Sequence, residues 1–351
     1  MDGYRKFLFG VALLFPCLGC GQEPPTLTRV EAPAGMVLQL QGDTMGVKWN
    51  VTTMGLNGDL AKLTEALQDA VGQVDEHMST YKPESEISRF GMAPANQDFA
   101  VSADTAFVVQ EAQRISALTN GAFDATVMPL VDLWGFGPAK ASDTAPAADA
   151  IAEALSRCGY QHVQLSAPNT LRKSAAGLRL DLSAIAKGYG VDAMCAALDA
   201  AGHENYLVEV GGELRVKGLS RDGSPWRIGI DTPRDMALPG TQLQGALELG
   251  DRAIATSGDY RNYRELDGKR ISHTIDPRTG YPVNHDLASV SILAPTCLEA
   301  DALATACMVL GAEEAMALIE RLDDIDIFLI VREGEEFLER KSAGFPKIET
   351  L

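Results

Sequence analysis

Apolar residues recur at helical spacing in the first half of the chain. Across residues 60–78 they lie three or four positions apart, as Leu63 and Leu67 illustrate, so this segment predicts an amphipathic helix with one buried face. The stretch "DTAFVVQEAQRISALTNG" predicts a second helix, with Asp104 as its N-cap and Asn120-Gly121 as its stop.

The second half of the chain mixes strand and helix patterns. "LRLDLSAIAKGYGVDAMCAALDAAG" predicts a strand, a tight connection and a helix, and "NYLVEVGGELRVKG" predicts a strand broken at Gly211-Gly212. Further on, "LASVSILAP" is typical of a strand, "CLEADALATACMVLG" and "AEEAMALIERL" of helices, and "DIFLIVREGEEFLER" of a closing hairpin. Because these elements follow no regular strand–helix–strand repeat, we expect an α+β fold.

One hairpin carries a candidate catalytic residue. In "RNYRELDGKRISHTID" the dipeptide Asp267-Gly268 separates two arms of alternating polar and apolar residues, which is a strong hairpin signal. His273 is then on the returning strand, and the stiff turn "DPRTG" after it would hold the imidazole in place. With an unperturbed pKa of about 6.5, histidine is the natural general base at neutral pH. The alternative is an ordinary structural histidine.

The N-terminus predicts export. A short basic start precedes an apolar run over residues 7–18, which is shorter than the roughly 20 residues of a membrane-spanning helix. We therefore interpret residues 1–19 as a signal peptide. Leu18-Gly19-Cys20 resembles a bacterial lipobox, so Cys20 is a candidate lipidation site, with cleavage of a plain secreted protein near Gly21 as the alternative.

The rest of the chain is expected to be a flexible tether and one domain. Residues 20–35 would form the tether and residues 36–351 the domain, with a candidate lobe boundary in the Pro/Ala/Ser-rich stretch 137–149. The composition is 46% hydrophobic, as in globular proteins, and the net charge of −18 argues against a nucleic-acid partner.

Four cysteines follow the leader: Cys158, Cys195, Cys297 and Cys307. They form no C-x-x-C pair, which argues against a zinc site. Cys195 and Cys307 lie in apolar helical stretches and should be buried thiols. In an oxidising compartment one disulfide stays open as an alternative.

Asp301 and Thr305 form a candidate metal site. They are four residues apart on a predicted helix, so their side chains share one face, with about 5–6 Å between Cβ atoms. Carboxylate and hydroxyl oxygens suit Mg²⁺. The alternative is a helix cap together with a threonine that bonds back to a carbonyl.

Two other stretches could bind a ligand. In "DLSAIAKGYG" Lys187 and two glycines stand at a helix start, which would suit an anion, although simple turn chemistry is the alternative and no Walker or Rossmann motif is present. Around residues 78–136, Tyr81 could be a stacking platform, and Asp124 needs either a backbone amide or a ligand as partner. We interpret Trp134 and Phe136 as a satellite aromatic core.

Eight blocks in this order resemble the ApbE family of FAD:protein FMN transferases, over about residues 45–311. They are "DTMGVKW", "MSTYKPESEISRF", "GAFDATVMPL", "DLSAIAKGYGVD", "VGGEL", "ATSGDY", "SHTIDPRTGYP" and "EADALATA". The resemblance implies a mixed fold of two lobes with the flavin nucleotide in the cleft between them. It also implies an enzyme that binds FAD, cleaves its pyrophosphate with Mg²⁺ and transfers FMN to a threonine hydroxyl of an exported flavoprotein domain, releasing AMP.

The resemblance also implies roles for individual residues. Mg²⁺ would be held by Asp301, Thr305 and the main-chain oxygen of Ala184, and His273 matches the family's proposed base. The implied FAD contacts are Met45, Tyr81, Ala122, Phe123, Asp124, Asp181, Lys187 and Ile275.

Two alternatives to a transferase stay open. The first is an FAD pyrophosphatase in which water replaces threonine, and the second is a lipid-anchored flavin carrier without catalysis. Export and the lipobox predict a lipoprotein of the bacterial inner membrane that faces the periplasm. Together with the family resemblance, export implies exported or membrane-bound redox flavoproteins as acceptors.

Overall fold

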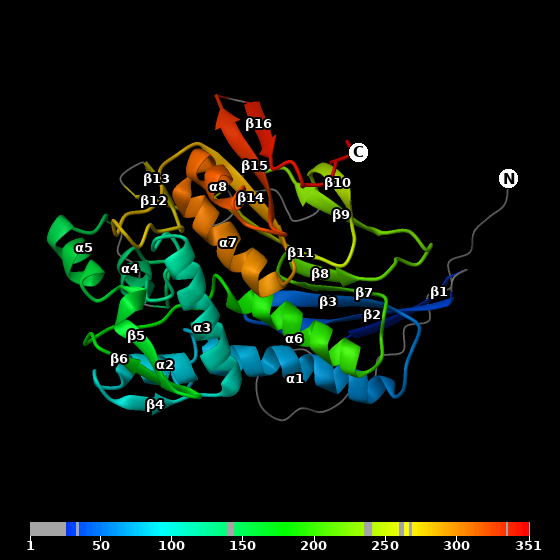
Figure 1. The fold of residues 1–351 in the computed structure, drawn as a ribbon, viewed down its shortest axis with the longest axis horizontal. Coiled ribbons are helices and arrows are strands. Elements are labelled where there is room, and N and C mark those ends of the chain that lie inside the picture. Colours follow the sequence, from blue (N-terminus) through cyan, green and yellow to red (C-terminus); the bar gives the residue numbers. More distant parts are fainter. Residues whose placement is uncertain are drawn as a thin grey trace.

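A nine-stranded antiparallel sheet is the centre of the fold (Figure 1). The computed structural model describes residues 26–32, 35–138, 144–234, 241–259, 263–266, 269–334 and 336–350. The strands, in their order across the sheet, are β1 (Thr26–Ala32), β2 (Gly35–Thr44), β3 (Val47–Met54), β7 (Tyr206–Val210), β8 (Glu213–Lys217), β11 (Ala253–Gly258), β14 (Leu287–Ala294), β15 (Asp326–Glu333) and β16 (Glu336–Lys341). The strands follow chain order across the sheet, so the N-terminal β3 lies next to β7 from the second half of the chain.

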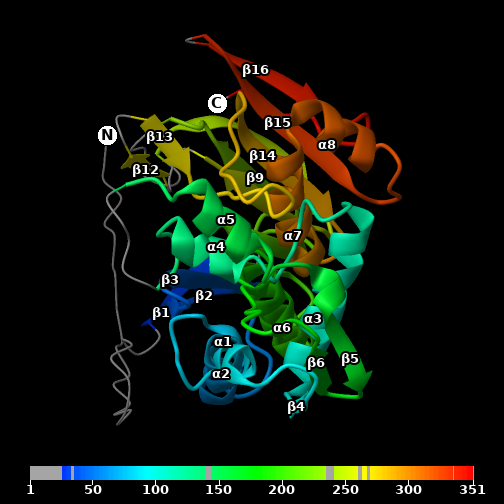
Figure 2. The ribbon, with the colours of Figure 1, turned by 90° about the vertical axis from the view of Figure 1, so that its left-hand side faces the viewer.

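Helices and three small sheets surround this centre (Figures 1 and 2). The helices are α1 (Leu60–Met78), α2 (Glu86–Met92), α3 (Ala103–Leu118), α4 (Met128–Leu133), α5 (Ala148–Leu155), α6 (Ala186–Ala200), α7 (Cys297–Leu310) and α8 (Ala312–Ile319), with a 3₁₀ turn at Tyr160–His162. The small sheets pair β4 (Asp98–Ala100), β6 (Thr170–Lys173) and β5 (Val163–Ala167); β9 (Trp226–Asp231) and β10 (Leu243–Leu249); and β12 (Tyr263–Leu266) and β13 (Lys269–Ser272). The predicted α+β class is confirmed.

Strand β14 is buried on both faces. In β14 all the residues are buried, and Ile292 packs into the core under the helices whereas Leu293 packs toward β9 and β10. A strand covered on both faces reads as a continuous apolar run rather than as an alternation. Helix α7 lies against this strand and most of its 14 residues are buried, so a charged side chain on α7 is immediately conspicuous.

Part of the predicted tether is a strand. Residues 26–32 form β1, which pairs antiparallel with β2 from Thr26 opposite Gln41 to Ala32 opposite Gly35. The segment is rich in β-branched residues and meets the open edge of β2, which explains why it extends the sheet. The predicted signal peptide, Cys20 and residues 139–143 of the candidate lobe boundary lie outside the described residues.

Most predicted helices are confirmed, with shifts at their ends. Helix α3 begins two residues earlier than expected, because Ser102 rather than Asp104 is the N-cap and accepts a hydrogen bond from the amide of Thr105. Asn120 and Gly121 both have positive φ, at 50° and 80°, as the predicted stop requires. Among the described helices none has the length and apolarity needed to cross a bilayer.

The strand predicted before α6 is wrong. Leu178, Leu180 and Leu182 alternate with more exposed residues, as in a strand, and their side chains are buried in the core. The segment nevertheless joins no sheet, and the amide of Asp181 donates to the carbonyl of Ala125 at 2.7 Å. The alternation of leucines with polar residues therefore reflects burial of one side of the segment and not pairing with a neighbouring strand.

The four cysteines of the domain are all free and buried. This resolves the open alternative of a disulfide and confirms the predicted burial of Cys195 and Cys307. Burial raises the pKa of Cys195 to about 12, as expected for an inert thiol.

Candidate functional site

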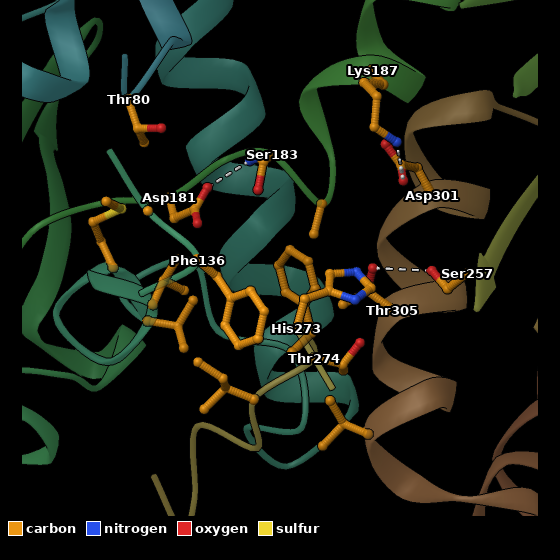
Figure 3. Close-up of a pocket in the computed structure, with 18 of the residues that line it drawn as sticks. Thr80, Phe136, Asp181, Ser183, Lys187, Ser257, His273, Thr274, Asp301 and Thr305 are labelled. Atoms are coloured by element: carbon orange, nitrogen blue, oxygen red, sulfur yellow. Dashed lines mark hydrogen bonds and ion pairs between the residues drawn. The ribbon is translucent and has the colours of Figure 1, made fainter. Parts of the chain in front are cut away.

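The predicted site residues gather around one cavity of about 680 Å³ (Figure 3). Its wall comes from the loop after α1, the segment that precedes and includes α4, the start of α6, strands β8 and β11, the hairpin β12–β13 and helix α7. The predicted residues that line it are Tyr81, Ala122, Phe123, Asp124, Asp181, Ala184, Lys187, His273, Ile275, Asp301 and Thr305.

Met45 is the exception. It lies in the tight turn between β2 and β3, with φ at 47°, and its partly buried side chain packs against the core beside Gly190. It does not line the cavity, whereas Val47 does. The side chain of Met45 therefore packs into the core next to the cavity and does not reach the position expected for a flavin contact.

Helix α7 presents Asp301 and Thr305 to the cavity from consecutive turns. Asp301 is only 3% exposed. The cap of α7 is formed by other residues: Thr296 accepts from the amide of Glu299, and Asp192 accepts from the amides of Cys297 and Leu298. Asp301 therefore does not cap its own helix.

The hydroxyl of Thr305 lies 3.3 Å from the hydroxyl of Ser257 on β11. This contact connects Thr305 to a strand of the sheet, and the alternative of a bond back along the described helix is not formed. Ser257 was not predicted as a site residue, because a serine in a strand carries no distinctive spacing.

A glycine lets α6 and α7 approach each other closely. A Cβ atom on Gly188 would lie 2.3 Å from the carbonyl oxygen of Cys297, a separation that real Cβ atoms do not show. At this short distance the amide of Gly188 donates to Oδ2 of Asp301 at 3.0 Å. The first turn of α6 therefore positions the carboxylate of α7.

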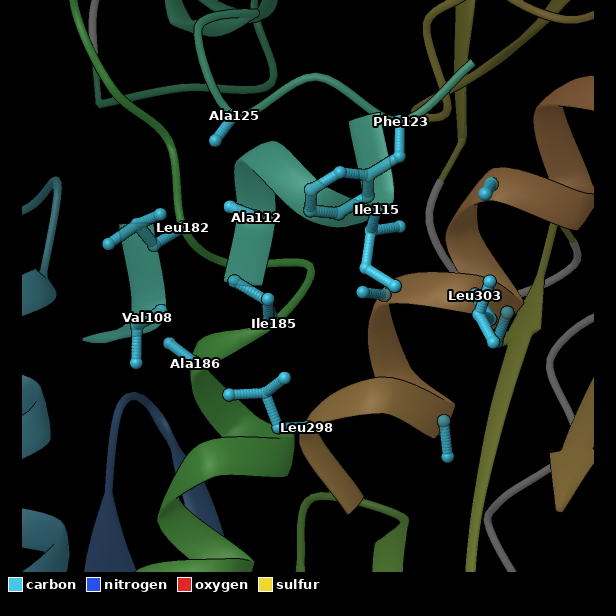
Figure 4. Close-up of a cluster of buried hydrophobic side chains, with 14 of the residues drawn as sticks. Val108, Ala112, Ile115, Phe123, Ala125, Leu182, Ile185, Ala186, Leu298 and Leu303 are labelled. Atoms are coloured by element: carbon cyan, nitrogen blue, oxygen red, sulfur yellow. The ribbon is translucent and has the colours of Figure 1, made fainter. Parts of the chain in front are cut away.

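The core behind the cavity makes this helix pair rigid. Figure 4 shows Leu298 and Leu303 of α7 in one buried cluster with Ile185 at the start of α6 and Ile115 of α3. All four side chains are buried. Closely packed interiors resist displacement, so this cluster holds α6 and α7 in place beside the cavity.

Lys187 connects two buried carboxylates. Its Nζ lies 2.6 Å from Oε1 of Glu213 and 3.7 Å from Oδ1 of Asp301. Burial raises the pKa of Glu213 to about 7, against the opposing attraction of Lys187. Burial alone would lower the pKa of Lys187, but the charges of Asp301 and Glu213 outweigh it and raise that pKa. Lys187 is therefore a firmly charged ammonium.

Glu213 was not predicted as a site residue. Glu213 is 4% exposed, and its Oε2 is buried without a hydrogen-bond partner among the described residues. The signal was present in "VGGEL", where a carboxylate follows two glycines at the start of an apolar strand, but we interpreted only the glycines.

The turn after His273 is anchored as expected. His273 lies one residue beyond β13, not within it. The amide of Gly280 donates to the carbonyl of Asp276 at 2.8 Å, and the indole of Trp134 donates to the carbonyl of Gly280 at 2.9 Å. The turn is therefore attached to α4's C-terminal end.

The His273 ring lies between Phe136 and Thr305 (Figure 3). The Phe136 ring meets it edge-on, with centroids 6.3 Å apart. The predicted satellite core is confirmed, because Trp134 is 5% exposed and Phe136 packs against the cluster around it. Phe136 in addition lines the cavity, which was not predicted. The imidazole thus faces the side-chain oxygen of Thr305 on α7, with the Phe136 ring on its other side.

The carboxylates of Asp124 and Asp181 accept hydrogen bonds from backbone amides. Asp124 accepts from the amides of Thr126 and Tyr160, both at 2.8 Å. Of its two predicted partners, a backbone amide or a ligand, the backbone amide is therefore present. Asp181 accepts from the amide of Ser183 at 2.9 Å. Burial raises the pKa of both carboxyl groups, against the lowering effect of these hydrogen bonds. Both therefore shape the wall.

Arg264 of β12 is a further wall residue that was not predicted. Its Nη1 donates to the carbonyl of Trp134 at 2.8 Å, and it lines the cavity together with Lys187. Two cationic side chains on this wall favour a ligand that carries negative charge, such as a phosphate ester.

These groups define a class of protein: an α+β enzyme whose cavity combines a candidate base, a buried carboxylate beside a hydroxyl, and cations suited to phosphate. The comparison with known families gives the same answer. The model of the ApbE family matches residues 45–329, so the chain belongs to the ApbE family, and the resemblance seen in its motifs is confirmed.

Relatives and solved structures agree with this assignment. A protein of Vibrio cholerae named FAD:protein FMN transferase is 43% identical over 97% of this chain and 98% of its own length, and one of Escherichia coli K12 with the same name is 39% identical over 97% and 96%. The structure of the flavin transferase ApbE from Vibrio cholerae matches with a TM-score of 0.80 at 42% identity, covering 91% of this chain and 98% of that one. The apo flavinyl transferase ApbE of Pseudomonas stutzeri gives 0.78 at 38%, over 88% and 95%.

Proposed function

We propose that this chain transfers the FMN part of FAD to a threonine hydroxyl of an acceptor protein, with Mg²⁺ and with release of AMP. The coarser part of this statement, transfer of flavin from FAD to a protein, follows from membership of a family whose relatives carry that name. The observation that carries the proposal is the meeting of His273, Lys187, Asp301 and Thr305 around one cavity.

The oxygens of the cavity fit a hard divalent cation. Asp301 and Thr305 supply a carboxylate and a hydroxyl, the carbonyl of Ala184 is part of the same wall, and the partnerless oxygen of Glu213 marks an excess of negative charge. No cluster of three metal-binding side chains occurs in the described ranges, which suits Mg²⁺, since that ion keeps water and phosphate among its ligands. When bound, Mg²⁺ would neutralise charge on the phosphate oxygens of FAD.

His273 would act as the general base. As the threonine oxygen bonds to the phosphorus of the FMN moiety, its proton passes to the imidazole, and the bond from that phosphorus to the oxygen of the AMP moiety breaks, with its electron pair leaving on AMP. General-base catalysis of this kind contributes about 10²–10⁴-fold in rate. Lys187 would offset charge on the same phosphates.

The partners and the location of the enzyme are part of the proposal. The apolar leader and the lipobox-like Cys20 support export and attachment to the periplasmic face of the inner membrane through a lipid chain. Acceptors would then be exported or membrane-bound redox flavoproteins. The same cavity would serve a pyrophosphatase if water replaced the threonine, whereas a non-catalytic flavin carrier would not need a base beside a cation site.

One experiment separates these activities. Purified enzyme is incubated with FAD and Mg²⁺, with and without a detergent extract of membrane proteins from the source cells, and FMN, AMP and flavin-labelled proteins are measured. We expect slow FMN release from FAD alone, and AMP release together with an FMN adduct on threonine, identified by peptide mass spectrometry, when the extract is present. Rapid release of free FMN without acceptor would support hydrolysis, and the absence of any product would support a carrier.

A further inference from the structure

The ammonium of Lys187 is shared unequally between two carboxylates. It is 2.6 Å from Glu213 and 3.7 Å from Asp301. The three groups come from different elements, namely the first turn of α6, the first residue of β8 and the second turn of α7. Their distances are therefore fixed by the packing of the fold rather than by one flexible segment.

Glu213 is held more firmly than a surface carboxylate. Glu213 pairs with Val210 in the β7–β8 hairpin, next to the turn at Gly211-Gly212. One side-chain oxygen bonds to Lys187, and the other is buried without a hydrogen-bond partner in the described part of the chain. Burying a carboxylate in this way is costly, so a role for the charge itself is the better explanation.

Above the raised pKa of Glu213, about 7, the three charges add up to one net negative charge. Lys187 contributes one positive charge, and Glu213 and Asp301 contribute one negative charge each. A lysine hydrogen-bonded to Asp301 would largely neutralise the carboxylate needed for a cation. Its contact with Glu213, at 2.6 Å, instead leaves the ammonium 3.7 Å from Asp301, which is beyond hydrogen-bonding distance.

We propose that Glu213 is a positioning residue that holds Lys187 against the cavity wall and so leaves the Asp301 carboxylate available to a divalent cation. This inference rests on the proposed cation site at Asp301 and Thr305. It predicts that Glu213→Gln, which removes the charge but retains the shape, lets Lys187 close on Asp301 and weakens Mg²⁺ binding about tenfold.

The test is a titration of the full chain with MgCl₂ by calorimetry, repeated with Mn²⁺ by electron paramagnetic resonance. We expect Glu213→Gln to bind both ions about tenfold more weakly than the wild type. Lys187→Met should bind at least as tightly as the wild type, and the double variant Glu213→Gln/Lys187→Met should bind like Lys187→Met. This rescue is specific to positioning, since a merely structural role for Glu213 would not be reversed by removing the lysine.

A matched control is available on the same hairpin. Glu209 accepts a hydrogen bond from the amide of Gly212 and does not line the cavity, so Glu209→Gln should leave cation affinity unchanged. An equal loss in Glu209→Gln, or an equal loss from Glu213→Gln in the Lys187→Met background, would overturn the inference; the second result would make Glu213 a direct ligand. Melting curves check folding, and if Glu213→Gln is unfolded, the charge-retaining Glu213→Asp takes its place, with affinity expected near the wild type.

The variant Asp301→Asn distinguishes the inference from the proposed function. Loss of cation binding in Asp301→Asn together with wild-type affinity in Glu213→Gln would overturn the inference alone. Wild-type affinity in Asp301→Asn, or no cation binding by the wild type, would overturn the cation site and the inference with it.

Discussion

The backbone on both sides of His273 fixes the direction of its ring. Strand β13 ends one residue before it, and the anchored turn begins three residues after it. A side chain on such a short, doubly attached segment needs little reorganisation before it takes a proton, which is the property required of a general base.

Replacement of the ring should separate binding from chemistry. We expect His273→Ala to bind FAD with an affinity close to that of the wild type, because Lys187, Tyr81 and Phe123 still line the cavity, while FMN transfer falls by at least about 10²-fold. Flavin fluorescence titration measures binding and single-turnover assays measure transfer. Transfer at the wild-type rate would remove His273 from the mechanism.

A second histidine should affect stability rather than catalysis. His203 is 1% exposed, its Nδ1 lies 2.8 Å from the hydroxyl of Thr53, and its Nε2 is buried without a partner in the described structure. Burial lowers the pKa of His203 in the folded state. The unfolded chain therefore binds this proton more readily than the folded chain does.

The sign of the pH effect follows directly. The contribution of His203 is fully present above the unfolded pKa of about 6.5 and is lost as the pH falls toward the folded pKa, by at most about 1.4 kcal/mol per pH unit. Glu213, with its raised pKa, acts in the opposite direction in the same window. Urea unfolding of the wild type and of His203→Gln at pH 7.5 and 5.5 isolates the effect: the wild type should lose more stability than the variant, and equal losses would contradict the prediction.

At the scale of elements, the close approach of α6 and α7 positions the carboxylate of the site. We expect Gly188→Ala to destabilise the fold by about 1–3 kcal/mol, because the added methyl group meets the backbone at Cys297, and also to weaken Mg²⁺ binding, because the hydrogen bond to Asp301 is displaced. Urea unfolding and cation titration measure the two effects.

Helix α1 offers the control for this prediction. A Cβ atom on Gly72 would meet nothing within 4 Å, so Gly72→Ala should stabilise the helix by about 0.5–1 kcal/mol through propensity alone and leave cation binding unchanged. If Gly188→Ala behaved like Gly72→Ala, the tight α6–α7 contact would not control the site.

Elements with one clear period were predictable from the sequence, and elements defined by distant partners were not. Helix α1 followed its apolar spacing, and β12 and β13 flank the predicted turn with Leu266 opposite Lys269. Leu178–Leu182 alternate as a strand does, but their backbone partner is a loop, which no local pattern reveals. Residues 26–32 were predicted to be part of a flexible tether for the same reason, because only pairing with the edge of β2 makes them a strand.

The same distinction holds for the site. Asp301 and Thr305 share a helix, so their spacing was informative, and the family motifs led to most of the wall. Glu213 and Phe136 reach the cavity through sheet pairing and loop packing, and they were missed. Met45 belongs to a matching motif, yet the tight turn directs its side chain into the core.

At the scale of the whole molecule, the cavity exists only when distant parts of the chain are assembled. Its wall extends from Val47 on β3 to Val309 on α7, and the sheet inserts β7 and β8 between strands from the two ends of the chain. Ligands that bind this cavity should therefore stabilise the molecule as a unit, since they bind the folded state and not the unfolded chain.

Such stabilisation also tests whether FAD and the cation share one site. If phosphate oxygens of FAD complete the shell around a cation held by Asp301 and Thr305, each ligand should bind more tightly in the presence of the other, and the coupling must be reciprocal. Melting temperatures of His273→Ala, in which FAD is not consumed, are measured with Mg²⁺, with FAD, with both and with neither. A ligand at 100 times its Kd contributes about 2.7 kcal/mol, so the combined shift should exceed the sum of the separate shifts. Strictly additive shifts would mean that the two ligands bind independently, and the arrangement of one dinucleotide and one cation in a common cavity would be wrong.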